Sequence, residues 1–226
     1  MKIDKIEGCA YMKKIKGCIF DLDGVIVDTA KYHYLAWKEI ADELGFEFTK
    51  KDNEKLKGVS RMDSLDILLQ IGNLNFDEKT KIDLAEKKNK IYVSYISKID
   101  KSEILEGVED FIKELKRNNI KIALGSVSKN AVPIIKNIGM LNYFDSVIDG
   151  NKITKAKPDP EVFLLGAKEL NLKPENCVVF EDAVKGIQAA KNAGMYAVGV
   201  GDPLILKQAD KVIPGFKGVN IDILNF

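Results

Sequence analysis

Residues 17–24 read Gly17-Cys18-Ile19-Phe20-Asp21-Leu22-Asp23-Gly24. The apolar run from Gly17 to Phe20 predicts a short buried strand, and it ends in two carboxylates and a glycine. A carboxylate at the rim of an apolar sheet must be desolvated or paired. In an open α/β sheet, the carboxyl end of a strand faces the crevice where ligands bind. We therefore interpret Asp21 and Asp23 as functional, the alternative being a strand followed by an ordinary polar turn.

Composition and charge narrow the class of protein. The 226 residues are enough for one sizeable domain with a smaller insert. Apolar residues make up 46% and charged residues 31%, which is ordinary for a globular protein in water. Lys and Arg total 35 against 34 Asp and Glu, so no excess of positive charge favours binding to nucleic acid or to an anionic membrane.

The cysteines and the first residues bear on the cellular compartment. Cys9, Cys18 and Cys177 cannot form a disulfide framework and lack metal-ligand spacing. No apolar run is as long as a membrane span, and residues 1–12 lack the apolar core of a secretory signal. We therefore expect a cytoplasmic protein, and we also expect a monomer. Because Met12 could itself be a start, we expect residues 1–11 to be a disordered extension or an artefact of the assigned start.

Strand and helix patterns alternate along most of the chain. Four more apolar runs predict strands, at Ile120–Ser126, Ser146–Ile148, Cys177–Asp182 and Tyr196–Val200. Helical patterns lie between or beside them, at Val108–Asn118, Lys129–Ile138, Pro160–Leu170 and Ala183–Ala193. This alternation predicts an α/β fold whose parallel sheet is covered on both faces.

One stretch interrupts the alternation. Between the first strand and the rest of the sheet, the pattern predicts only helices, at Thr29–Leu44, Ser60–Ile71 and Glu78 to about Ile99. A helical block in this position is typical of a lid over an active site. We therefore expect a core domain made of residues 12–29 and 101–226, with a helical cap at residues 30–100.

The two acids after the first strand suit phosphoryl transfer. Asp21 is the natural nucleophile, because an ionised carboxylate needs no deprotonation, only a cation that screens its approach to a phosphate. Asp23 can donate a proton to a leaving oxygen and later accept one from an attacking hydroxyl. Its main-chain carbonyl could also reach a metal ion, and Gly24 lets the chain turn there at little steric cost.

Three further sites complete this chemistry, although each has a simpler reading by itself. Ser126 follows a strand and can hydrogen-bond a phosphoryl group, but serine is common there. Lys157, before Pro158, can neutralise charge on the nucleophile and the phosphate, or it is a surface lysine beside a turn. Glu181 and Asp182 end another strand and could form an all-oxygen Mg²⁺ site with Asp21, while Asp182 would also suit a helix N-cap.

Taken in order, Asp21-Leu22-Asp23-Gly24, Ser126, Lys157-Pro158 and Glu181-Asp182 resemble the four motifs of the haloacid dehalogenase superfamily. The resemblance covers about residues 13–226. It implies a Rossmann-like, doubly wound parallel sheet with an inserted all-helical cap. It also implies that Asp21 forms an aspartyl-phosphate intermediate.

Within that superfamily, the chain resembles the β-phosphoglucomutase family. The matching pieces are Asp28-Thr29-Ala30, Tyr32-His33, Ala36-Trp37, Leu56-Lys57-Gly58-Val59-Ser60-Arg61, Asp63-Ser64-Leu65, Lys88-Asn89, Lys121-Ile122-Ala123-Leu124 and Ser126-Val127-Ser128-Lys129-Asn130. The substrate-binding set that this resemblance implies comprises His33, Trp37, Gly58, Val59, Ser60, Arg61, Ser64, Lys88, Val127, Ser128, Lys129 and Asn130.

The resemblance also implies individual roles. Arg61, Ser128 and Asn130 would grip the phosphate distal to the reacting one, and Gly58, Val59 and Ser64 would shape the sugar site. Lys88 would reach from the cap to the catalytic loop, and His33 would support Asp23 and Lys88. Because His33 shares a helical stripe with Trp37, packing remains an open alternative for both.

The expected activity follows from these roles. We expect a Mg²⁺-dependent interconversion of β-D-glucose 1-phosphate and β-D-glucose 6-phosphate, through an aspartyl-phosphate and glucose 1,6-bisphosphate. The expected partners are therefore a small sugar phosphate and a sugar bisphosphate. One alternative is a sugar-phosphate or phosphoglycolate-type phosphatase that uses the same core residues with water as the acceptor. A second is a non-catalytic binding module.

Overall fold

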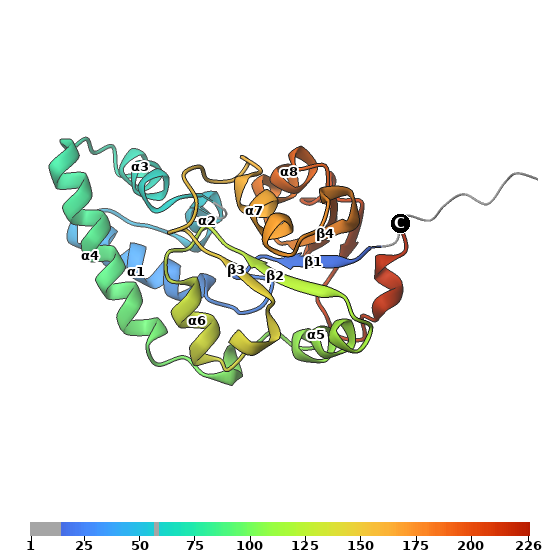
Figure 1. Cartoon of the computed structure of the whole chain (residues 1–226). Coiled ribbons are helices and arrows are strands. Elements are labelled where there is room, and N and C mark those ends of the chain that lie inside the picture. Colours follow the sequence, from blue (N-terminus) through green and yellow to red (C-terminus); the bar gives the residue numbers. More distant parts are fainter. Residues whose placement is uncertain (1–14, 57–58) are drawn as a thin grey trace, which may run out of the picture.

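The computed structural model describes residues 15–56 and 59–226. The predictions about residues 1–11, about the start of the core at residues 12–14, and about Gly58 therefore concern positions outside the described residues. Figure 1 shows a sheet with helices on both faces and a group of helices, α1 to α4, to one side of it. This is the predicted fold class, an α/β core with an inserted helical cap.

Within the described residues, the sheet has six parallel strands in the order β3-β2-β1-β4-β5-β6. Five of them lie where apolar runs predicted them: β1 (Gly17–Phe20), β2 (Lys121–Gly125), β3 (Ser146–Ile148), β4 (Cys177–Glu181) and β5 (Tyr196–Val200). The sixth, β6 (Lys211–Ile213), was not predicted, because three residues at the sheet edge carry too short an apolar pattern.

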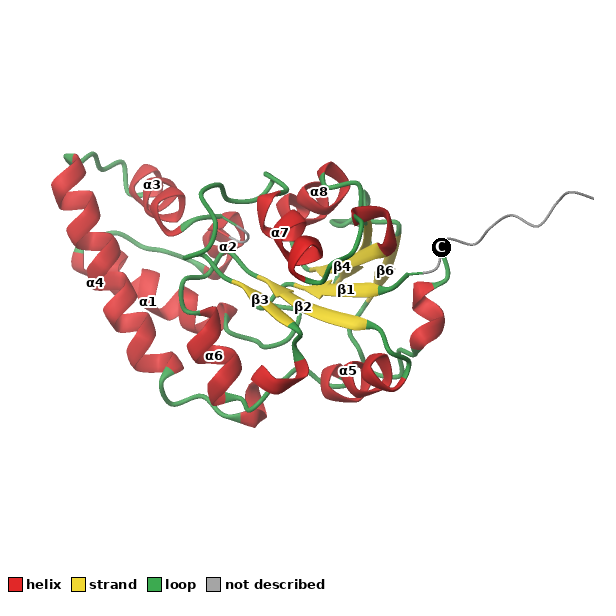
Figure 2. Ribbon diagram, in the orientation of Figure 1, coloured by secondary structure: helices red, strands yellow, loops and turns green. Residues whose placement is uncertain are grey.

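Side-chain alternation along β1 determines how the two faces of the sheet are covered. On one face, Phe20 packs in a cluster with α5 (Val108–Arg117) and α6 (Ala131–Asn137). On the other face, Ile19 packs in a cluster with α7 (Glu161–Glu169) and α8 (Val184–Asn192). Figure 2 shows these two helical layers on opposite sides of the strands. The sheet is thus doubly wound, and β1 is buried along its whole length.

Aromatic rings form the centre of the larger cluster. The rings of Phe20 and Phe180 stack across β1 and β4 with centroids 4.7 Å apart. Phe111 from α5 meets Phe180 edge-on at 5.4 Å, and Phe216 lies 5.5 Å from Phe111. These contacts hold α5 against the two strands whose carboxyl ends carry Asp21 and Glu181.

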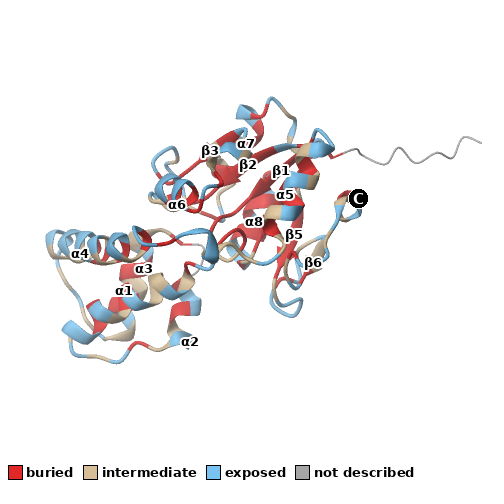
Figure 3. Ribbon diagram, turned by 90° about the horizontal axis from the view of Figure 1, so that it is seen from below, coloured by how far each residue is buried: buried red, intermediate tan, exposed pale blue. Residues whose placement is uncertain are grey.

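The helices of the cap have a core of their own. They are α1 (Ala30–Glu43), the short α2 (Lys50–Asn53), α3 (Arg61–Ile71) and α4 (Glu78–Ile96). Trp37, Ile40, Leu65 and Leu68 are buried together among them. Figure 3 shows this group beside the core, with many exposed residues on its outer side. The boundaries at residues 30 and 100 stay a prediction, and α2 was not predicted because four residues are too few for a helical period.

The predicted helix starts in the cap follow capping chemistry. The Ser60 side chain accepts a hydrogen bond from the Asp63 main-chain N–H at 3.2 Å, which makes Ser60 the N-cap of α3. Asp77 caps α4 in the same way through the N–H of Thr80, at 2.8 Å. α4 ends at Ile96, three residues earlier than predicted. Among residues 15–56 and 59–226, we find no helix with both the length and the apolarity needed to cross a membrane.

Replacing Phe111 with alanine tests the aromatic cluster. We expect Phe111→Ala to lower the free energy of unfolding by about 3–5 kcal/mol, because a buried ring is lost and a cavity remains. Urea denaturation followed by circular dichroism measures this. Leu204, 74% exposed, is the matched control, and Leu204→Ala should change stability by less than about 0.5 kcal/mol. Equal losses in the two variants would contradict the assignment of the cluster as the core.

Candidate active site

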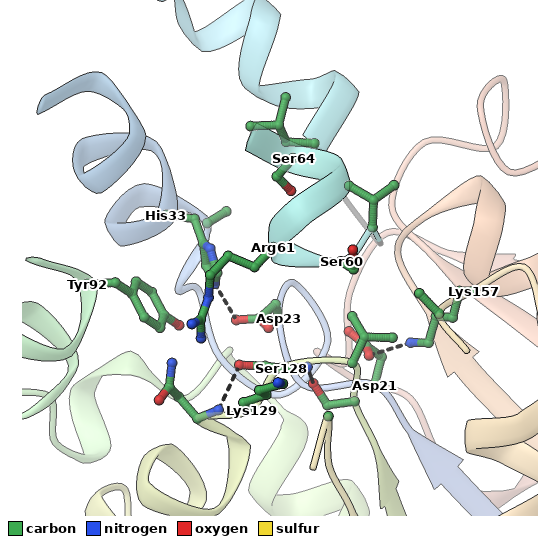
Figure 4. Close-up of a pocket in the computed structure, with 18 of the residues that line it drawn as sticks. Asp21, Asp23, His33, Ser60, Arg61, Ser64, Tyr92, Ser128, Lys129 and Lys157 are labelled. Carbon is green, nitrogen blue, oxygen red and sulfur yellow. Dashed lines mark hydrogen bonds and ion pairs between the residues drawn. The ribbon is translucent and has the colours of Figure 1, made fainter. Parts of the chain in front are cut away.

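The strand order marks where a site should form. From β1 the chain fills one half of the sheet with β2 and β3, and then the other half with β4, β5 and β6. The carboxyl ends of β1 and β4 therefore lie at a topological switch point, where open α/β sheets bind ligands. A cavity of about 330 Å³ opens there, lined by residues from both the core and the cap. Figure 4 shows side chains from the two parts pointing into it.

Every predicted site residue that the structure describes lines this cavity. From the core these are Asp21, Asp23, Ser126, Val127, Ser128, Lys129, Asn130, Lys157, Glu181 and Asp182. From the cap they are His33, Trp37, Val59, Ser60, Arg61, Ser64 and Lys88. The individual roles assigned to them stay predictions.

Strand register brings the acids together. Phe20 pairs with Phe180, and the main-chain N–H of Asp21 donates to the carbonyl of Phe180 at 3.0 Å. Asp21 thus lies beside Glu181, and both are buried. One carboxylate oxygen from each of Asp21, Glu181 and Asp182 lies within 4.8 Å of the others.

This set of donors fits a hard divalent cation. Three carboxylates with oxygen donors only are the ligands that Mg²⁺ prefers over softer metals. The Asp23 carboxylate is not one of the three. Its predicted contribution was the main-chain carbonyl, and that stays a prediction.

Lys157 neutralises part of this negative charge. Its Nζ lies 2.5 Å from Asp21 Oδ1 and 2.7 Å from Glu181 Oε2, and its side chain is only 1% exposed. Burial alone would lower the pKa of Lys157, but the two carboxylates outweigh it and raise that pKa above the usual value. The ammonium therefore stays charged, as a buried ion pair requires. The simpler reading of Lys157 as a surface lysine is wrong.

Asp23 lies in a different environment from Asp21. The Thr29 hydroxyl donates a hydrogen bond to Asp23 Oδ1, and His33 Nε2 lies 4.0 Å from the same oxygen. Burial and then the charge of Asp21 raise the pKa of Asp23 to about 7. A carboxyl that titrates near neutral pH can both give and take a proton, which suits general acid–base chemistry.

A lysine and a histidine link Asp23 to the cap. Lys88 Nζ lies 3.0 Å from His33 Nδ1 and 4.7 Å from the ring centres of both Trp37 and Tyr92. Burial, then Lys88 and Arg61, lower the pKa of His33 well below its usual value. The imidazole is therefore neutral, so Nδ1 can accept from Lys88 while Nε2–H faces Asp23.

The predicted distal phosphate site combines a cap residue with a core loop. Arg61 opens α3, and its guanidinium points toward the loop that carries Ser128 and Lys129 (Figure 4). That loop is ordered by its own hydroxyls: Ser126 Oγ accepts from Ser128 N at 3.1 Å, and Ser128 Oγ accepts from Asn130 N at 3.2 Å. The Ser128 hydroxyl, the Asn130 amide and the Arg61 guanidinium are hydrogen-bond donors that can hold a second anion here.

Several lining residues were given no role from the sequence. Asn89 Oδ1 accepts from Asn130 Nδ2 at 3.0 Å, joining cap to core. The Tyr92 ring packs on His33, with centroids 4.1 Å apart. Both could have been found, since Tyr92 lies one helical turn after Lys88 and Asn89 lies beside it. The segment after β3 that supplies Ile153 to Ala156 carries no such signal.

Comparisons with known proteins found a matching family model and several similar proteins. The family model described as haloacid dehalogenase-like hydrolase matches residues 15–194. A β-phosphoglucomutase of Bacillus subtilis is 40% identical over 213 residues, covering 93% of this chain and 94% of that protein. A phosphorylated carbohydrates phosphatase of Thermotoga maritima is 31% identical over 187 residues, covering 80% of this chain and 82% of that protein.

Solved structures show the same likeness. The crystal structure of a β-phosphoglucomutase from Clostridium difficile matches with a TM-score of 0.89 and 45% sequence identity. The match covers 93% of this chain and 95% of that one. The chain is thus similar to a mutase over almost its whole length, and to a phosphatase over a smaller part.

The buried ion pairs predict a large effect of removing Lys157. We expect Lys157→Met to lower the free energy of unfolding by roughly 3 kcal/mol or more, because Asp21 and Glu181 lose their shared cation. Added Mg²⁺ should restore part of the loss, since it supplies positive charge at the same carboxylates. Urea denaturation with and without Mg²⁺ measures both effects. The exposed Lys155 is the control, and a loss in Lys157→Met no larger than in Lys155→Met would refute the role of this lysine.

Proposed function

The chain belongs to the haloacid dehalogenase-like hydrolases, and on that premise we propose that it is a β-phosphoglucomutase. It would interconvert β-D-glucose 1-phosphate and β-D-glucose 6-phosphate through an aspartyl-phosphate and a glucose 1,6-bisphosphate. Similarity to the mutases of Bacillus subtilis and Clostridium difficile, at 40% and 45% identity, supports this proposal over that of a phosphatase.

One observation supports the proposal: a single cavity is lined by two separate groups of side chains that can bind anions. Asp21 and Lys157 line it on one side, and Arg61 and Lys129 lie toward the other (Figure 4). A phosphatase needs only the first group, because its substrate has one reacting phosphate. A bisphosphate that must turn round and present either end needs the second group as well.

The proposed first step uses Asp21 and Asp23. A carboxylate oxygen of Asp21 attacks the phosphorus at C1 of glucose 1,6-bisphosphate, and the bond from that phosphorus to the sugar oxygen breaks, which leaves glucose 6-phosphate. Asp23, whose pKa is raised to about 7, gives its proton to that leaving oxygen. Lys157, 2.5 Å from Asp21 Oδ1, neutralises charge on the nucleophile and on the transferring group.

The second step reverses these roles. After glucose 6-phosphate leaves, the 6-hydroxyl of a β-D-glucose 1-phosphate attacks the phosphoryl group on Asp21, and the bond from phosphorus to the Asp21 oxygen breaks. Asp23 takes the hydroxyl proton, and glucose 1,6-bisphosphate is formed again. Arg61, Ser128 and Asn130 would hold the non-reacting phosphate during each transfer, and between transfers the bisphosphate turns round so that its two phosphates exchange places. From the cap, Lys88 binds the neutral imidazole of His33, and His33 in turn orients Asp23.

The carboxylates of Asp21, Glu181 and Asp182 would hold Mg²⁺ in this enzyme. A bound Mg²⁺ screens the repulsion between the nucleophile and the phosphate. Water must be excluded from the phospho-enzyme, because hydrolysis would convert a mutase into a phosphatase. The Asn89–Asn130 contact between cap and core supports closure of the cavity. Cytoplasmic location and a monomeric state stay predictions.

Phosphorus NMR tests the proposal. Purified protein with Mg²⁺, β-D-glucose 1-phosphate and a trace of glucose 1,6-bisphosphate should produce the signal of glucose 6-phosphate, with little inorganic phosphate. Inorganic phosphate without glucose 6-phosphate would refute the mutase. Such a result would favour a sugar-phosphate or phosphoglycolate-type phosphatase, the activity class that the Thermotoga maritima relative supports. Phosphate release from a panel of phosphomonoesters would then identify its substrate.

Asp21→Asn tests the nucleophile. Turnover should fall by about four orders of magnitude or more, as for other lost nucleophiles, because an amide cannot form the phospho-enzyme. Coupled glucose 6-phosphate assays measure turnover, and intact-protein mass spectrometry detects the phosphoryl group. The exposed Asp28, seven residues further along the same segment, is the control. Asp28→Asn should keep both the turnover and the phosphorylation of the unmodified protein. Phosphorylation of the Asp21→Asn protein would show that another residue is the nucleophile.

Arg61→Ala separates the two anion-binding groups. Mutase turnover should fall by about 10- to 100-fold, the effect of losing a charge-assisted hydrogen bond. Hydrolysis of acetyl phosphate, which has no distal phosphate, should change little. The exposed Arg117 provides the control, and Arg117→Ala should leave both rates unaltered. Equal losses of mutase and hydrolysis in Arg61→Ala would contradict its role as a distal anchor.

A further inference from the structure

A glycine in the first turn of α8 lacks the usual backbone reasons for a glycine. Gly186 is buried inside the helix, where glycine is less favourable than alanine. Its φ is not among the positive values that glycines in this chain adopt. The backbone conformation therefore does not require glycine, and the reason must lie in the space around the residue.

That space is filled by the Glu181 side chain. A Cβ at Gly186 would lie 2.0 Å from Glu181 Cδ, 2.1 Å from its Oε2 and 2.3 Å from its Cγ. Real Cβ atoms essentially never approach other atoms so closely. An alanine at 186 and the observed position of the Glu181 carboxylate therefore exclude each other.

The Glu181 carboxylate has little freedom to move away. Its Oε2 accepts from Lys157 Nζ at 2.7 Å, and its Oε1 accepts from the main-chain N–H of Ala183 at 3.1 Å. The residue is 1% exposed, and Lys157 is itself bound to Asp21. Displacing the carboxylate would break these bonds inside the protein, where water cannot replace them.

The neighbouring acid packs against a glycine in the same way. A Cβ at Gly24 would lie 2.3 Å from Asp182 Oδ2. Gly24 also has a φ of 80°, so the turn favours glycine there in any case. Gly186 isolates the effect of space from the effect of backbone conformation.

We propose that Gly186 is a positioning residue, which leaves the room that the Glu181 carboxylate occupies between Lys157 and the metal-binding oxygens. The proposal rests on the magnesium site of the proposed function. Metal ligands depend on the groups that orient them, and here the orienting feature is the absence of a side chain. Gly186 itself touches neither substrate nor metal.

Magnesium binding to the full chain, measured by calorimetry without sugar phosphate, tests the proposal. Gly186→Ala should weaken Mg²⁺ binding by about tenfold or more, as lost orienting groups do in other metal sites. The control is Gly166→Ala in α7, where the nearest atom to the new Cβ would be the flexible end of Ile19, at 3.2 Å, and the other neighbours would lie at 3.6 Å or more. That variant should bind Mg²⁺ like the unmodified chain.

A stability cycle gives a second readout, independent of metal. In the unmodified chain, Gly186→Ala should destabilise the fold, because the carboxylate is displaced. In a chain that also carries Glu181→Ala, the same change should stabilise it, since alanine is the better helix former. If Gly186→Ala alone fails to fold, adding Glu181→Ala should restore folding.

Several results would overturn the proposal. Gly186→Ala with unaltered Mg²⁺ affinity would do so, as would equal destabilisation with and without Glu181, or a double variant that stays unfolded. An unmodified chain that binds no Mg²⁺ would overturn the magnesium site itself. A chain that passes these tests but makes no glucose 6-phosphate would refute only the mutase activity.

Discussion

The parallel pairing of β1 with β4 is the constraint on which the rest of this site depends. Its register places Asp21 beside Glu181 at the carboxyl edge of a sheet whose strands are otherwise apolar. Two buried carboxylates that lie side by side repel each other strongly, because little water screens their charges. The fold tolerates them because Lys157 contacts both. In the chemistry that we propose, these carboxylates attract positive charge, which a bound Mg²⁺ can supply in addition to Lys157.

The different environments of Asp21 and Asp23 follow from this arrangement. Asp21 has a cation at 2.5 Å, whereas Asp23 has a hydroxyl, a neutral imidazole and the negative charge of Asp21 as its neighbours. One carboxyl is therefore suited to attack and the other to carry a proton, although they are two residues apart. The cap takes part in this division, since His33 and Lys88 come from α1 and α4.

Close packing limits the site as much as charge does. The Glu181–Asp182 pair lies against Gly186 and Gly24, so the acids occupy space that any larger side chain would take. On the cap side, Lys88 Nζ lies over the rings of Trp37 and Tyr92. Trp37 thus packs in the cap core and lines the cavity at the same time, and its contact with a substrate stays a prediction.

The sequence by itself determined the elements and the edge at which the site forms. Five of the six strands and the longer helices follow from local periodicity. Acids and small polar residues at strand ends must meet, because parallel strands end at one edge. The tertiary structure alone decided which side chains touch: Thr29 with Asp23, Lys88 with His33, and Asn89 with Asn130. Such pairs depend on how the cap packs against the core. Local sequence patterns indicate burial and periodicity within one helix or strand. They do not indicate how two such elements are oriented relative to each other.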